Sequence, residues 1–363
     1  CFQKICAERA GCNIDRVYLV HLNGEYVRGR KVEPSELLVF VDITNDVNAI
    51  MAETNDEIDA ALAFLESDQR KDGCSCVTKT RGNHCDAFNV LNPDIPKYSV
   101  YVLPRISAKK LRELRDMDII DLRTVPNNAV LTRSQRMVVD SFQECRPKVD
   151  ISAIEKFLSN LIFPIYFLDF ETFSSAVPLF EGASPHKHFP VQYSIHILQS
   201  DGSLAHREYL ERCPRFPEYL LEKMERDIAE IGSVISWHAS FEKTQNREMS
   251  VMFPSKEDFL LGLNERMVDL EDVFKTSYVD VRFEGSTSIK KVLPIVCPNL
   301  NYDDLQVKDG ALAIEAWERM VKSEPDQANK IADDLLKYCE RDTFAMVEIY
   351  RFLAELGGRN SCS

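Results

Sequence analysis

Two carboxylates separated by one residue stand at the end of a very apolar stretch. Asp169 and Glu171 follow residues 165–168, whose apolar run is typical of a buried strand. Side chains alternate along a strand, so both carboxylates are expected on one face of a sheet. Burying acidic groups is unfavourable unless their charge is compensated. Two divalent cations would compensate this charge. Metals about 3.5–4 Å apart can also clamp the attacking and leaving oxygens of phosphodiester hydrolysis.

Oxygen ligands favour Mg²⁺ or Mn²⁺ at such a site. The same pair could instead end a strand and hydrogen-bond to neighbouring loops. The Asp169-x-Glu171 pattern leaves both interpretations open.

Two further segments offer acidic side chains. Tyr338 and Asp342 are four residues apart in a helical pattern, which places them on one helix face. Asp is a poor former of helix interiors, so Asp342 either has a functional role or pairs at the surface with Arg341. Glu242 is expected at a helix start after a strand, where the helix dipole favours a carboxylate in any case.

The order of these motifs resembles that of the DEDD 3′–5′ exonucleases. The three motifs are Asp169-x-Glu171-Thr172, His238-x-x-Phe241-Glu242 and Tyr338-x-x-x-Asp342. The resemblance implies an RNase H-like fold. It also implies that Asp169, Glu171, Glu242 and Asp342 bind metal and that Tyr338 orients the attacking water or helps to deprotonate it. Glu242 and His238 depart from the family, which usually has Asp and commonly has Asn at these positions.

Residues 164–355 resemble more narrowly the family called domain of unknown function 2779. The stretches that carry this likeness are 167–173, 178–180, 190–196, 264–270, 288–294 and 338–347. The likeness also places Asp269 near the site, although a helix cap explains it equally well.

The chemistry-bearing residues need an α/β scaffold. Strands are expected at residues 165–170, 191–198, 206–210 and 233–237, with helices at 217–231 and 326–356. Three successive strands, then a helix, a strand and further helices, predict an α/β fold with a mixed sheet covered by helices. The exonuclease resemblance implies that this fold is RNase H-like. We assign this domain to residues 151–363 and a small helical module to residues 97–150.

Cys74, Cys76 and Cys85 gather in a loop rich in Gly and Asn. A disulfide framework is typical of small secreted chains, so this spacing favours a bound metal, although the cysteines could also be unrelated. His84 could complete a zinc site, and a cysteine preceding residue 1 could complete a 4Fe-4S cluster.

Residues 1–96 resemble the C-terminal part of a RecB-like, iron–sulfur nuclease domain of the PD-(D/E)xK class. The likeness rests on Phe2-Gln3, on residues 15–23 and on residues 26–28. We expect a helix at the start, strands at 16–22 and 25–28 joined by a turn at Asn23-Gly24, a strand at 37–42 and a helix at 44–67. The acidic and lysine residues of such a nuclease would precede residue 1, so this part should be inactive by itself.

The charge and composition of the chain indicate which kinds of partner it could bind. The net charge is −14, whereas proteins that bind phosphate backbones usually carry a basic footprint. Residues 97–148 are an exception, with eleven basic and six acidic side chains. This segment either contacts phosphate or forms an ordinary solvated surface. No stretch resembles a membrane span or a signal peptide, which predicts a cytoplasmic protein without a membrane partner.

Together these patterns predict a metal-dependent nuclease, most simply a 3′–5′ exonuclease acting on an end of single-stranded DNA or RNA. The alternative is a non-catalytic nucleic-acid-binding or scaffold protein with a degenerate exonuclease fold, whose chemistry resides in an absent N-terminal nuclease part.

Overall fold

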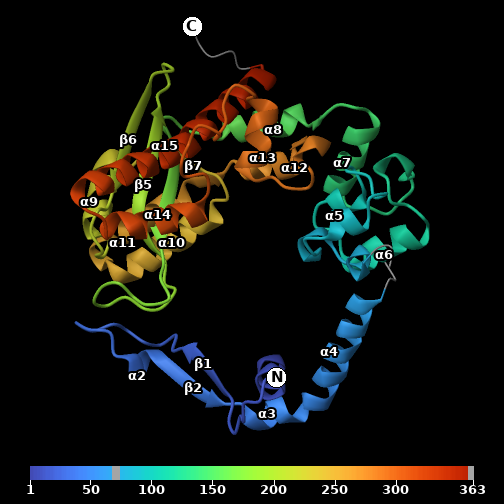
Figure 1. Ribbon diagram of the computed structural model, residues 1–363. Helices are drawn as coiled ribbons and strands as arrows, with labels where there is room; N and C mark the ends of the chain where they lie inside the picture. Colours follow the sequence, from blue (N-terminus) through green and yellow to red (C-terminus); the bar gives the residue numbers. More distant parts are fainter. Residues whose placement is uncertain (68–73, 359–363) are drawn as a thin grey trace. The chain divides into compact units, whose positions relative to one another are not determined.

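The computed structural model describes residues 1–67 and 74–358 (Figure 1). The chain divides into two compact units, one formed by Cys1–Asp72 with Ser174–Lys187 and the other by Gly73–Phe173 with His188–Ser363. Within the described ranges, none of the helices combines the length and apolarity that crossing a membrane requires.

The first unit contains a two-stranded sheet and four helices. Its elements are α1 (Phe2–Arg9), β1 (Tyr18–Leu22), α2 (Pro34–Leu37), β2 (Leu38–Asp42), α3 (Thr44–Ala49) and α4 (Met51–Glu66). The predicted hairpin at Asn23-Gly24 is wrong, because β1 pairs antiparallel with β2. Residues 25–28 instead continue as a loop, in which buried Tyr26 accepts a hydrogen bond from the Glu33 N–H at 3.1 Å.

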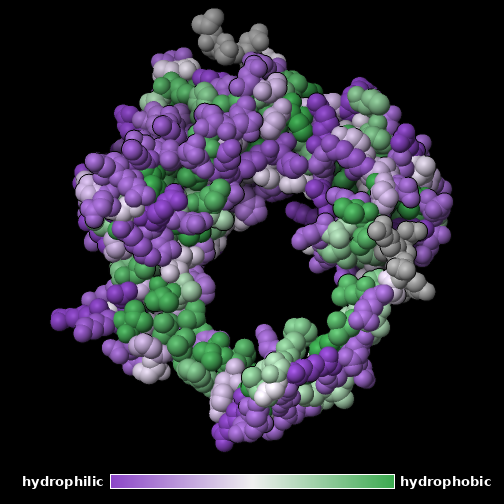
Figure 2. Space-filling view, in the orientation of Figure 1, coloured by the Kyte–Doolittle hydropathy of each residue, from purple (hydrophilic) through white to green (hydrophobic). Residues whose placement is uncertain are grey.

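Much of the apolar material of the first unit is exposed. Tyr18, Leu19, Val20 and Phe40 of its sheet are each between 45% and 64% exposed, and Figure 2 shows hydrophobic side chains gathered over β1, β2 and α4. A two-stranded sheet has too little partner surface to bury both of its faces.

The second unit begins with short helices around a small core. Residues 75–78, 81–83, 100–102 and 122–124 form 3-10 turns, and the helices are α5 (Phe88–Leu91), α6 (Ala108–Asp116) and α7 (Arg133–Gln143). Ser107 caps α6 as its position predicts, by accepting a hydrogen bond from the Lys110 N–H at 3.1 Å. The core of this region also includes Val279 and Val281, and β3 (Lys148–Val149) pairs with β9 (Tyr278–Val279). The helical region is therefore packed onto the C-terminal half.

A five-stranded mixed sheet forms the centre of the second unit. Its strands, in the order β6-β5-β4-β7-β8, are β6 (Leu204–Leu210), β5 (Phe189–Leu198), β4 (Ile165–Phe173), β7 (Ser233–Ser236) and β8 (Met267–Asp269). β5 runs antiparallel to both of its neighbours, β4 and β6, whereas β7 and β8 run parallel to β4. The predicted α/β class and mixed sheet are confirmed, and β8 is an additional strand.

Helices cover both faces of this sheet. The helices after β3 are α8 (Ile151–Ser159), α9 (Glu218–Asp227), α10 (Ser240–Met252), α11 (Glu257–Glu265), α12 (Glu271–Thr276), α13 (Ile289–Val296), α14 (Gly310–Val321) and α15 (Pro325–Leu356), with 3-10 turns at residues 254–256 and 281–283. Leu168, Tyr193 and Ile195 pack against α9, α10 and α11. The long α15 lies along the opposite face (Figure 1), where the Gln192 side-chain amide donates to the Leu335 carbonyl at 3.0 Å.

Candidate metal centre

The central strand β4 presents the first two carboxylates. Asp169 lies opposite Ser194 of β5, and Glu171 lies opposite Gln192, so both point to the face covered by α15. On the other side, β7 pairs only with residues 165–167 of β4. Asp169 and Glu171 therefore lie just beyond the point where β7 stops, and the strand end leaves room for a site.

Helix α15 brings Tyr338 and Asp342 to this place. Their spacing puts both on one helix face, as predicted, and the residues are 3% and 8% exposed. Cys339, between them in sequence, places its Sγ 3.6 Å from Asp169 Oδ2. The side chains of Asp169, Glu171, Tyr338 and Asp342 line one cavity of about 170 Å³, together with Trp237, Ser288, Ile289, Lys290 and Met346.

The carboxylates of this cavity destabilise one another's charged forms. Burial raises the pKa of Asp169 well above its usual range, and the charges of Asp342 and Glu171 raise it further. Burial and the Asp342 charge raise the pKa of Glu171 to about 8. Burial also raises the pKa of Asp342, although a hydrogen bond from Tyr302 opposes this effect. The pocket thus concentrates more negative charge than the surrounding side chains balance.

Glu242 joins the group from the first turn of α10. Its side chain is 3% exposed, and burial raises its pKa to about 7. Its charge raises the pKa of both Asp169 and Glu171, although Glu242 does not line the cavity wall. Its Oε2 is buried and has no close hydrogen-bond partner among the described residues, although the nearby Ser236 hydroxyl lowers the pKa of Glu242. A buried acceptor so weakly satisfied is costly, and a cation would satisfy it.

Tyr338 is held by a lysine that the sequence motifs did not single out. Lys290 Nζ, near the start of α13, donates to Tyr338 Oη at 3.1 Å and lies 5.1 Å from the centre of its ring. Burial and the charges of Asp342 and Glu171 raise the pKa of Tyr338 far above its usual value. The phenol therefore stays protonated near neutral pH. This favours orientation of a water molecule over its deprotonation.

Tyr302 is a second residue that sequence reasoning missed. Its Oη donates to Asp342 Oδ1 at 2.5 Å, and its side chain is buried. The charge of Lys290 also lowers the pKa of both Glu171 and Asp342. Lys290 belongs to a stretch that carries the family resemblance, which could have marked it. Tyr302 lies in a connection between helices and gave no such signal.

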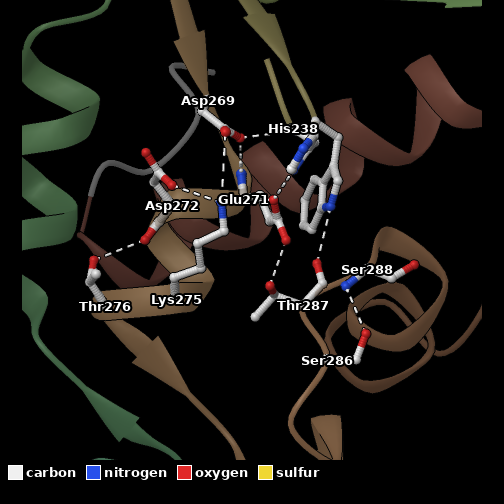
Figure 3. Close-up of polar contacts among 10 residues, drawn as sticks. His238, Asp269, Glu271, Asp272, Lys275, Thr276, Ser286, Thr287 and Ser288 are labelled. Carbon is white, nitrogen blue, oxygen red and sulfur yellow. Dashed lines mark hydrogen bonds and ion pairs between the residues drawn. The ribbon is translucent and has the colours of Figure 1, made fainter. Parts of the chain in front are cut away.

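A polar cluster beside the cavity positions the loop that leads into α13, the helix that carries Lys290 (Figure 3). Glu271 accepts hydrogen bonds from the Thr287 hydroxyl at 2.6 Å and pairs with Lys275 at 2.8 Å and with His238 Nδ1 at 3.0 Å. The Trp237 indole N–H donates to the Thr287 carbonyl at 3.1 Å. These contacts fix Thr287, three residues before Lys290.

Asp269 has a structural role in the same cluster. Its Oδ1 accepts from the backbone N–H groups of His238 and Glu271, both at 3.0 Å, and so ties the end of β7 to the start of α12 (Figure 3). Its charge raises the pKa of Glu242, so Asp269 is also close to the carboxylate group. His238 adopts φ +66°, a left-handed conformation in which Asn is favoured over most other residues. This explains why Asn suits this position.

The three clustered cysteines form a separate group. The sulfur atoms of Cys74, Cys76 and Cys85 lie within 4.8 Å of one another. Asn92 Nδ2 donates a hydrogen bond to Cys74 Sγ at 3.5 Å. That hydrogen bond lowers the pKa of the Cys74 thiol. His84 does not complete the group here. Its Nε2 donates to the Lys79 carbonyl at 3.0 Å, and its ring stacks on Phe88 at 3.6 Å.

The comparisons with known proteins add a family but no described activity. The chain resembles the uncharacterized protein MG366 of Mycoplasma genitalium, with 25% identity over 54% of this chain and 32% of the relative. It also resembles the MG366 homolog of Mycoplasma pneumoniae, with 27% identity over 53% of this chain and 32% of the relative. These matches span about a third of the length of the curated relatives. No solved structure gives a significant match.

A family match covers the part of the chain that contains the five-stranded sheet and three of the four candidate carboxylates. It spans residues 166–288 and is described as Domain of unknown function (DUF2779). The family likeness predicted from the sequence is thereby confirmed over this range. Residues 166–288, which hold Asp169, Glu171 and Glu242, match the model of this family.

Proposed function

We propose that the second unit is a metal-dependent nuclease that acts as a 3′–5′ exonuclease on single-stranded DNA or RNA ends. One observation carries this proposal: carboxylates from β4, α10 and α15 act on one another around a small cavity that Tyr338 also lines. Groups with strongly perturbed pKa values in a cleft are typical of functional sites.

The sheet supports an RNase H-like fold for this unit. Three antiparallel strands are followed by two strands parallel to the first, which is the mixed arrangement such a fold needs. The first strand carries Asp169 and Glu171, and the last long helix carries Tyr338 and Asp342. The elements therefore come in the order that the exonuclease resemblance implies.

The donor set fits hard divalent cations. Asp169, Glu171, Glu242 and Asp342 offer only carboxylate oxygens, which suit Mg²⁺ or Mn²⁺. The buried, weakly satisfied Oε2 of Glu242 and the raised pKa values of the other three carboxylates are what an excess of anionic ligands produces when no cation balances them. Bound cations would supply Lewis acidity and lower the pKa of an attacking water.

Side chains of the protein itself would position the water, the phosphate and the metal ligands. Lys290 holds the Tyr338 phenol at 3.1 Å, so that the protonated Oη can donate to a water or to a phosphate oxygen. The Lys290 ammonium is itself in the cavity wall and attracts an anionic phosphate. Tyr302 fixes the rotamer of Asp342 through its hydrogen bond. This arrangement positions groups rather than forming a covalent intermediate.

Two observations favour a second candidate function, a non-catalytic nucleic-acid-binding or scaffold protein. Glu242 lies outside the cavity wall, which disfavours catalysis, and the net charge of −14 opposes phosphate binding, which favours the scaffold role. In this case the carboxylate site would be degenerate.

We also propose that the first unit and the cysteine loop derive from a RecB-like nuclease domain. The exposed apolar faces of β1 and β2 need further covering structure, which supports a role as part of a larger domain. Cys74, Cys76 and Cys85 would hold zinc or a 4Fe-4S cluster with a fourth ligand from outside the group. Visible absorbance of anaerobically purified protein would separate the two, since zinc is colourless.

The nuclease proposal is tested with 5′-labelled single-stranded DNA and RNA in Mn²⁺. We expect wild-type protein to shorten both from the 3′ end, and a 3′ phosphorothioate cap to block it. Asp342→Asn should abolish shortening, whereas exposed Asp303→Asn should not. Equal degradation by wild type and Asp342→Asn would reveal a contaminant. Binding without cleavage would favour the non-catalytic candidate.

A further inference from the structure

A second cluster of potential metal ligands lies on the α15 side of the sheet. His196 of β5 and His206 of β6 are paired across the two strands, and their rings stack with centres 4.6 Å apart. Glu340 of α15 approaches His206 Nδ1 to 4.0 Å. One nitrogen of each ring and one Glu340 carboxylate oxygen lie within 4.8 Å of one another. None of these three residues takes part in the proposed nuclease site.

Two hydroxyl groups fix the orientation of both rings. His196 Nδ1 lies 2.8 Å from Thr343 Oγ1, and His206 Nε2 lies 2.9 Å from Ser194 Oγ. The two hydroxyls are 2.8 Å apart. Histidines that bind metal almost always use their second nitrogen in such a hydrogen bond, which sets the tautomer and the ring orientation.

The protons of this network can be assigned consistently. Thr343 Oγ1 donates to the Glu340 carbonyl at 3.1 Å, so Ser194 donates its hydroxyl proton to Thr343. Each hydroxyl then still accepts a hydrogen bond, from His206 Nε2–H and from His196 Nδ1–H. This assignment leaves His196 Nε2 and His206 Nδ1 without protons. Burial lowers the pKa of His196 to about 4 and also lowers that of His206, which favours neutral rings.

The spacing is close to that of a zinc site. Ligand atoms about 2.0–2.1 Å from zinc in tetrahedral geometry are about 3.3 Å apart. The 4.0 Å between His206 Nδ1 and Glu340 thus needs to shorten by about 0.7 Å, and the other two pairs, which lie within 4.8 Å, by at most about 1.5 Å. Glu340 is half exposed and can move without disturbing the core.

We propose that His196, His206 and Glu340 bind a divalent transition-metal ion, most simply zinc, with water as the fourth ligand. Two nitrogen donors and one carboxylate suit zinc, whereas the all-carboxylate cavity suits Mg²⁺ or Mn²⁺. The ion would tie β5 and β6 to α15, the helix that carries Tyr338 and Asp342. This site is independent of the proposed nuclease activity.

The test uses the full chain, stripped with EDTA and labelled with ¹⁵N at histidine. Ring nitrogens are followed by NMR as zinc is added, and His196→Gln and His206→Gln assign the signals. Before zinc, we expect protons on Nδ1 of His196 and Nε2 of His206. Zinc should then shift His196 Nε2 and His206 Nδ1. A doubly protonated His206 paired with Glu340, or rings that zinc leaves unchanged, would overturn the proposal.

Glu340→Gln tests the third ligand with little risk to folding, because the side chain is half exposed. Removing a residue that hydrogen-bonds to a metal ligand lowers the metal affinity about 10–100-fold. Removing the ligand itself should therefore weaken zinc binding to these histidines at least tenfold. Glu355→Gln is the matched control, since it removes the same charge from an exposed position about 22 Å along α15. Equal zinc affinity in the two variants would exclude Glu340 and contradict the three-ligand site.

Discussion

Replacing Glu171 with Gln should stabilise the metal-free protein at alkaline pH. In the folded protein the pKa of Glu171 is raised from 4.5 to about 8, first by burial and then by the charge of Asp342. The folded state therefore holds a proton that the unfolded state has lost between these two values. Stability must fall as pH rises through this window, because the unfolded state binds fewer protons.

The magnitude follows from the two pKa values. Each pH unit between them costs about 1.4 kcal/mol, which gives about 3 kcal/mol at pH 7 and at most about 5 kcal/mol above pH 8. Glutamine resembles the protonated acid and cannot ionise. Glu171→Gln should therefore match wild type near pH 5 and exceed it by a few kcal/mol at pH 8.

Urea unfolding in EDTA at pH 5, 7 and 8 measures this difference. Glu315→Gln, which removes an exposed carboxylate of α14, controls for net charge. Added Mn²⁺ should stabilise wild type at pH 8, because a ligand of the folded state raises stability, but should stabilise Glu171→Gln much less. If wild type and Glu171→Gln lose stability in parallel between pH 5 and 8, Glu171 does not bear the buried charge that we describe.

Three further predictions concern neighbouring residues. Tyr302→Phe removes the 2.5 Å hydrogen bond to Asp342 and should weaken Mn²⁺ binding about tenfold, measured by calorimetry; unchanged affinity would deny Tyr302 a positioning role. Lys290→Met removes a charge that lowers the pKa of Glu171, so the stability loss in EDTA should extend to higher pH in urea titrations; an unmoved profile would contradict that coupling. Burial lowers the pKa of His196 to about 4, so metal-free wild type should lose up to about 3 kcal/mol as pH falls from 6.5 to 4. His196→Gln should lack this loss of stability in the same titration. An equal loss of stability at acid pH in both proteins would refute the prediction.

The parts of the site that sequence could predict are those set by periodicity. Alternation along β4 puts Asp169 and Glu171 on one face, and helical spacing puts Tyr338 and Asp342 on another. Each of these placements follows from the residue pattern of a single strand or helix. Lys290 reaches the cavity from a short helix, and Tyr302 reaches Asp342 from a connection between helices. Their positions depend on tertiary packing that local patterns do not encode.

The errors in the fold have similar causes. Asn23-Gly24 is a common hairpin signal, yet β1 pairs with β2, because Tyr26 is buried and anchors the intervening loop. Strand β8 has only three residues, too few for an alternating pattern to be recognised. The order of the strands in the sheet depends on contacts between segments far apart in sequence, although the mixed α/β class could be inferred.

Direct measurement of Mn²⁺ binding tests the central claim that Asp169, Glu171, Glu242 and Asp342 form a divalent-metal site. Free Mn²⁺ is counted by electron paramagnetic resonance as it is titrated into the EDTA-stripped chain at pH 8. We predict two bound ions in wild type, as a two-metal site requires, the same number in Asp303→Asn, and loss of at least one in Asp342→Asn. Identical titrations for wild type and Asp342→Asn would contradict the account.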